Sequence, residues 1–94
     1  MSPDRPEKSA KAVALRYAPD KDAAPRVVAK GRGYLAEAIQ AIARENHVPL
    51  LEDPNLVEVL EALDLHLEIP PELYRAVAEV LVFVYRLNGK LRQP

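Results

Sequence analysis

Residues 26–46 read RVVAKGRGYLAEAIQAIAREN and combine two patterns in one short stretch. The segment RVVAKG (26–31) predicts a short strand that is closed by Gly31. From Gly33 to Asn46, apolar side chains recur at helical spacing among alanines, which predicts an amphipathic helix. A strand that leads directly into a helix favours a fold of the α/β class.

The turn between these two elements is KGRG, residues 30–33. A strand joined to a helix N-terminus is an arrangement that can bind phosphate, because the first helical N–H groups are free. The stretch lacks the fuller glycine pattern of a P-loop or of a dinucleotide fold. We therefore interpret its glycines as the requirement of a tight strand-to-helix turn.

Downstream, VPLLED (48–53) is a short apolar run between turn signals and predicts a buried strand. Together with 26–46 it would form a right-handed crossover between parallel strands. Asp53 then resembles a helix N-cap followed by Pro54 at the first helical position. That helix has an apolar stripe formed by Leu56, Val57, Leu60 and Leu63.

Upstream, KAVALRY (11–17) alternates large and small apolar side chains and predicts a strand, whereas 18–25 reads as a loop. Residues 1–10 have two prolines and little apolar content, which predicts a flexible lead. We expect one domain over residues 11–90. Its expected architecture is a single-layer mixed sheet of about three strands packed with three helices, in the order β-β-α-β-α-α.

The last predicted helix, ELYRAVAEVLVFVYRL (72–87), opens after Pro70-Pro71 and is expected to end at Asn88-Gly89. Its apolar surface is wider than the stripe of an ordinary surface helix. One stripe contains Leu73, Val77, Val80, Val84 and Leu87. The second stripe contains Tyr74, Ala78, Leu81 and Tyr85. The second stripe is either buried between sheet and neighbouring helix or partly exposed for a partner.

Composition excludes several classes of function. The chain has 94 residues, no cysteine and a net charge of −1, which argues against thiolate metal sites and nucleic-acid binding. No apolar run is long enough to span a membrane. His47 and His66 lack a ligand spacing, and Ser2 and Ser9 lie in the predicted lead. We expect no enzyme, no metal and no cofactor.

Several segments together resemble the cytoplasmic C-terminal domain of the FlhB/YscU/SpaS family of type III export switch proteins. They are AVALRY, APRVVAKGRG, IAxENxVP (42–49) followed by an acidic DP turn, and IPPELYRAVAEVLVFVYRL. Together they cover about residues 11–88. Family members cleave themselves at an Asn-Pro-Thr-His turn, where this chain has Glu7-Lys8-Ser9-Ala10. The resemblance therefore implies a free-standing, FlhB-like (FlhX-type) protein without autocleavage.

The resemblance also implies a function. The family domain contacts export substrates of rod and hook type and the cytoplasmic part of the export gate, with the hook-length control protein as a further partner. Its apolar substrate patch corresponds here to Ala24, Pro25, Ala78 and Leu81, to which Tyr74 and Tyr85 are added from the second stripe. We expect a cytoplasmic protein that acts at the membrane export gate and influences substrate specificity. The alternative is a regulatory or scaffold domain of the same fold with an unrelated protein partner.

Overall fold

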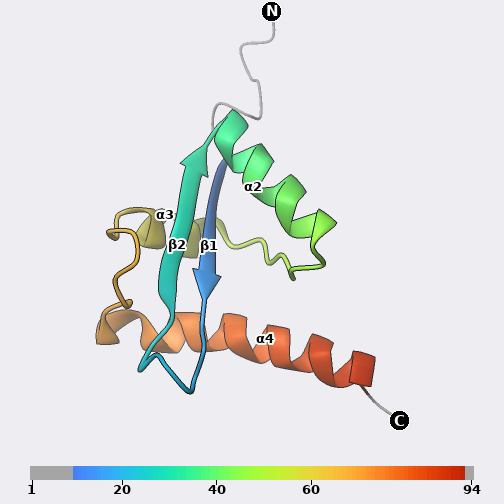
Figure 1. Ribbon diagram of the computed structural model, residues 1–94. Helices are drawn as coiled ribbons and strands as arrows, with labels where there is room; N and C mark the ends of the chain where they lie inside the picture. Colours follow the sequence, from blue (N-terminus) through green and yellow to red (C-terminus); the bar gives the residue numbers. More distant parts are fainter. Residues whose placement is uncertain (1–9, 93–94) are drawn as a thin grey trace, which may run out of the picture.

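The computed structural model describes residues 10–92, with side chains up to Leu87, so the predicted lead falls outside the described part except for Ala10. The elements are β1 (Lys11–Arg16), β2 (Arg26–Arg32), α2 (Tyr34–Glu45), α3 (Pro54–Glu61), the short 3-10 helix η1 (Pro71–Leu73) and α4 (Tyr74–Arg92). In Figure 1 the two strands stand between α2 and α3, and α4 crosses below the end at which β1 finishes and β2 begins.

β1 and β2 form an antiparallel hairpin with an irregular register. Ala14 pairs with Ala29, but the next residue of β1, Leu15, pairs with Val27. Val28 is therefore an extra residue on β2, which makes a β-bulge. Beyond the bulge, Arg16 lies directly opposite Arg26.

The main core lies between the sheet and the layer of α3 and α4. Val27 and Val77 are almost completely buried there, and the cluster is completed by Ala24, Leu56, Leu60 and Ile69. Val13 and Leu15 of β1 pack against it, as their alternation in the sequence predicts. The helix α2 packs on both strands and buries two alanines, Ala36 and Ala43, whose small side chains permit a close approach.

The prediction of a third strand at 48–53 is wrong. In the described residues the sheet has two strands, and 48–52 is an irregular connection in which Val48, Leu50 and Leu51 are between 41% and 52% exposed. Pro49 has no N–H to donate to a ladder, which weakens any strand there. The expected parallel crossover is consequently absent from this part of the chain.

The outer edge of β2 is instead partly covered by the connector that follows α3. The His66 N–H donates to the Val27 carbonyl at 2.7 Å, and the Ile69 N–H donates to the Pro25 carbonyl at 2.9 Å. Between them Glu68 forms an isolated antiparallel bridge with Arg26. The sequence predicted only a connector here, but this segment forms some of the backbone hydrogen bonds to β2 that a third strand was expected to form.

The strand-to-helix turn confirms the interpretation of its glycines. Gly33 has φ 59° and ψ −127°, a conformation that side chains disfavour. A Cβ on Gly31 would lie 2.4 Å from Cγ of Leu35, so the first turn of α2 folds tightly over the end of β2. Both glycines are required by local geometry.

The ends of the helices follow capping chemistry only in part. The Leu56 N–H donates to the Asp53 carboxylate at 3.1 Å, which confirms the predicted N-cap of α3. The prediction that Asn88-Gly89 ends the last helix is wrong, because α4 continues to Arg92. Asn-Gly favours a helix end without enforcing it, and the helix-forming residues 90–92 follow.

Ion pairs fix α3 to the hairpin. Arg32 of β2 binds Glu61 with two nitrogens, one of them at 3.0 Å, and Lys11 of β1 pairs with Glu58 and Glu61. Lys30 donates to the carbonyls of Glu61 and Leu63 at 2.9 and 2.6 Å, where the helix leaves its carbonyls without partners. These contacts orient α3. They thereby position Leu56 and Leu60, which belong to the core cluster with Val77 of α4.

Candidate protein-binding surface

The two apolar stripes of α4 are buried to very different degrees. In the first, Val77 is 1% exposed and Leu73, Val80, Val84 and Leu87 are half-buried. In the second, Tyr74 is 46% exposed, Tyr85 is 56% exposed, Ala78 is exposed and Leu81 is half-buried. The second stripe is thus not enclosed by the described part of the chain.

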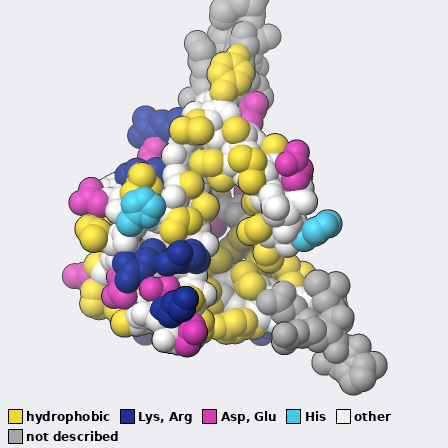
Figure 2. Space-filling view, in the orientation of Figure 1, with side chains coloured by type: hydrophobic (Ala, Val, Ile, Leu, Met, Phe, Trp, Pro, Cys, Tyr) yellow, Lys and Arg dark blue, Asp and Glu magenta, His cyan; other side chains and the backbone are white. Residues whose placement is uncertain are grey.

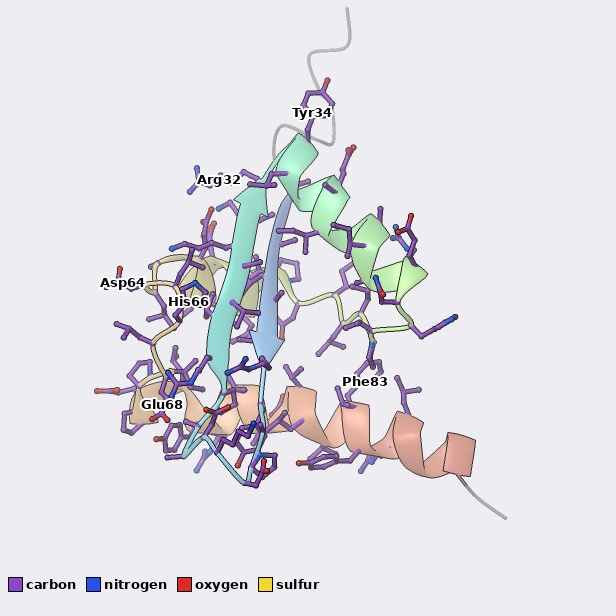
Figure 3. The ribbon with its side chains drawn as sticks, in the orientation of Figure 1. Arg32, Tyr34, Asp64, His66, Glu68 and Phe83 are labelled. Atoms are coloured by element: carbon purple, nitrogen blue, oxygen red, sulfur yellow. The ribbon has the colours of Figure 1, made fainter. Side chains whose placement is uncertain are left out.

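The sequence did not single out Val82, which is 44% exposed beside the second stripe. Its position in the helical repeat is the only signal that could have found it. Phe83 is half-buried and, in Figure 3, points up from α4 on the side of the connection between α2 and α3. We define the α4 surface as Tyr74, Ala78, Leu81, Val82 and Tyr85.

Ala24 and Pro25 lie beneath the surface rather than on it. Ala24 is 2% exposed and belongs to the core cluster that contains Val77 of α4. Pro25 is also buried, and its carbonyl accepts the hydrogen bond from Ile69. The structure therefore joins the loop and the helix through the core, but it does not expose the two loop side chains together with those of α4.

The loop before β2 is held by a buried carboxylate. The side chain of Asp22 is 4% exposed, accepts from Arg26 Nε at 3.0 Å and accepts from the Ala18 N–H at 3.2 Å. The hydrogen bond from Arg26 is the main cause that holds the pKa of Asp22 below its usual value, with smaller contributions from Ala18 and Arg16. This carboxylate orders the chain that leads into Ala24 and Pro25.

Arg26 extends this arrangement to the connector after α3. Its guanidinium donates to the His66 carbonyl at 2.7 Å and to Glu68 at 3.4 Å. Glu68 in turn accepts from the Ala23 N–H at 3.1 Å. The loop, the start of β2 and the connector are therefore linked by hydrogen bonds beside the first turns of α4.

The two histidines and the acidic side chains are the candidate ligating groups of the described residues. No group of three or more His, Asp or Glu side chains within them could hold a metal ion. His47 and His66 both adopt a positive φ, 59° and 71°, which marks them as turn residues. No described helix has both the length and the apolar character to cross a membrane.

Comparison with known proteins gives consistent matches. The model of the FlhB HrpN YscU SpaS family matches residues 9–84. The Bacillus subtilis protein YlqH is 44% identical over 82 residues, which cover 87% of this chain and 88% of that protein. The flagellar biosynthetic protein FlhB of Escherichia coli is 48% identical over 77 residues, covering 81% of this chain and 20% of FlhB.

A solved structure shares the fold. The crystal structure of the cytoplasmic domain of FlhB from Shewanella putrefaciens has a TM-score of 0.79 and 34% sequence identity, covering 89% of this chain and 73% of that chain. Fold and sequence together define a small α/β domain of the type III export class. The chain belongs to the FlhB HrpN YscU SpaS family, which confirms the resemblance found in the sequence. It spans about a fifth of the E. coli FlhB that it matches.

Proposed function

We propose that this chain is a non-enzymatic protein-interaction module of the flagellar or type III export apparatus. In this proposal it acts in the cytoplasm at the export gate, binds export substrates or gate components, and influences which substrates are exported. It does so without autocleavage, since Ala10 and the three residues before it differ from the Asn-Pro-Thr-His turn. Family membership supports the general role, and the open α4 surface supports the mode of binding.

The single observation that carries the proposal is the exposure of the second stripe. Tyr74 and Tyr85 are half exposed, and Ala78 lies between them on the same side of the helix. Tyrosine supplies a large contact area and a hydroxyl for hydrogen bonding, and it is enriched in protein interfaces. A row of this kind suits a short apolar segment with hydrogen-bonding groups along one side.

Ala24 and Pro25 have a supporting role in this proposal. Because both are buried, substitutions there would act on a partner through the position of α4 and not through lost contacts. Loop variants are therefore expected to weaken binding and stability together. Variants of Ala78, which is exposed, are expected to weaken binding alone.

A calorimetric titration with a purified rod- or hook-type export substrate tests the proposal, with the cytoplasmic part of the export gate as a second ligand. Ala78→Asp places a charge in the middle of the α4 surface and should reduce affinity at least about tenfold, since desolvating an unpaired carboxylate costs more than 1.4 kcal/mol. Ala38→Asp makes the same change at an exposed position of α2 and serves as the matched control.

Equal affinities of the two variants would remove the α4 surface from the proposal. Failure of both ligands to bind the unsubstituted chain would favour the scaffold function with an unrelated partner. Unchanged thermal unfolding of both variants is needed for the comparison, and the exposure of Ala78 and Ala38 makes it the expected result.

A further inference from the structure

A second feature, separate from the α4 surface, is an open hollow of about 590 Å³ beside the lower end of the hairpin. We call it the basic hollow. It is lined by Arg16, Lys21, Asp22, Arg26, Val28 and His66. In Figure 3 His66 lies beside β2 with Glu68 below it, and in Figure 2 Lys and Arg side chains gather next to a histidine on that side.

The β-bulge creates the charge imbalance of this hollow. The register shift at Val28 places Arg16 directly opposite Arg26, so two cations face each other across the ladder. Like charges in directly opposed positions destabilise a strand pair. Bulges occur often where a strand redirects side chains for a purpose other than pairing.

Only one of these two cations forms an ion pair within the described residues. Arg26 binds Asp22 at 3.0 Å and Glu68 at 3.4 Å. Both oxygens of Asp22 are engaged, one by Arg26 and one by the Ala18 N–H. Within residues 10–87, no ion pair joins Arg16 or Lys21, and Lys21 is held at the rim by a turn in which its N–H donates to Ala18 at 2.9 Å.

We propose that the basic hollow binds an acidic segment of a protein partner, whose carboxylates bridge Arg16 and Lys21 while an apolar side chain contacts Val28. Both cations are exposed, so a ligand reaches them without rearrangement of the fold. The hollow is open rather than enclosed, which suits a chain passing over it more than a small molecule held within it. Acidic residues also occur at the edges, and the chain has a net charge of −1, which disfavours a long polyanion such as nucleic acid.

The test is an NMR titration of the labelled chain with the peptide acetyl-Glu-Glu-Leu-Glu-Glu-amide and with its glutamine counterpart. The glutamate peptide should shift the amides of Arg16, Lys21 and His66, and the glutamine peptide should not. Arg16→Gln and Lys21→Gln should each weaken binding about two- to fivefold, the range expected for one exposed ion pair. Arg44→Gln on α2 removes the same charge elsewhere and should have no effect.

Two further probes distinguish other oxyanions. The first probe is inorganic phosphate and the second is a single-stranded oligonucleotide. If either binds the same residues more tightly than the glutamate peptide, the assignment to an acidic protein segment is overturned. Equal weakening by Arg44→Gln, or shifts that the glutamine peptide reproduces, would overturn the site itself. Ala78→Asp changes the α4 surface and leaves the basic hollow intact. If this variant loses substrate binding but still binds the glutamate peptide, the two sites are independent, so this inference and the proposed function can be tested separately.

Discussion

His47 follows α2 in a position where many helices place glycine. Its φ is 59°, the Val48 N–H donates to the Ala43 carbonyl at 2.8 Å, and the His47 N–H donates to the Arg44 carbonyl. This is the hydrogen-bond pattern of a Schellman motif, in which the left-handed residue is usually glycine. The imidazole therefore occupies a backbone position that costs free energy to adopt.

His47→Gly should consequently stabilise the protein. Relief of the left-handed conformation outweighs the added entropy of the unfolded chain and should raise the free energy of unfolding by about 0.5–1 kcal/mol. Urea denaturation monitored by circular dichroism would measure the change. Ala41→Gly, at an exposed position within α2, should instead lower it by about 1 kcal/mol; destabilisation by both variants would show that the His47 side chain contributes in the folded state.

The role of a single residue was predictable where its residue type strongly prefers one structural position. Asp53 before Pro54 indicated an N-cap, and Gly33 indicated a turn, and both have those roles. The left-handed histidine was not predictable, because the preference of histidine for this conformation is weak beside that of glycine. Its conformation follows from the chain having to leave α2 toward 48–52.

At the scale of elements, charge adds to the buried leucines in attaching α3 to the hairpin. The hydrogen bond from Arg32 is the main cause that lowers the pKa of Glu61, and Lys11 contributes as well. A carboxylate with a lowered folded pKa stabilises the fold above its ordinary value of 4.5 and loses that contribution as the pH falls through the folded pKa. Asp22 acts in the same direction through Arg26.

Stability should therefore be constant near neutral pH and fall in acid below about the ordinary value of Glu61. Glu61→Gln should lower the urea midpoint at pH 7 and flatten the acid decline, because the amide has no charge to lose. Urea midpoints between pH 7 and pH 3 would show this. Glu45→Gln, an exposed change at the end of α2, should leave the profile unchanged; an unaltered decline in Glu61→Gln would contradict the account.

The free edge of β1 gives a second prediction for an element. Within the described residues β1 pairs with β2 alone, so alternate N–H groups of Lys11–Arg16 point away from any partner strand. Hydrogen exchange should be fast at those amides and slow at the ones bonded to β2. Uniform protection along β1 would show that a second copy or a segment outside the described residues covers the edge.

Element types were predictable where periodicity was long, and unpredictable where it was short. The twelve residues of α2 were recognisable from spacing alone. The run at 48–53 was not, because short apolar runs are ambiguous and its side chains turn out half exposed. The bulge at Val28 was also invisible, since register depends on both strands and on the loop between them.

At the scale of the whole molecule, the sequence identified which helix has excess apolar surface but not how the loop before β2 relates to it. Within the described residues the second stripe is partly exposed, and its contact with a partner stays a prediction. Ala24 and Pro25 are buried, and only tertiary packing decides that. The basic hollow was missed because Arg16 and Arg26 are ten residues apart and come together only through the bulged hairpin.

The central claim is that the α4 surface docks an export substrate. The most direct measurement is an NMR titration of the labelled chain with the N-terminal region of a rod- or hook-type substrate, repeated with Leu81→Asp and Ala78→Asp. The account predicts shifts that cluster at Tyr74, Ala78, Leu81 and Tyr85 and that disappear in both folded variants. Shifts that cluster elsewhere, or none at millimolar peptide, would contradict it.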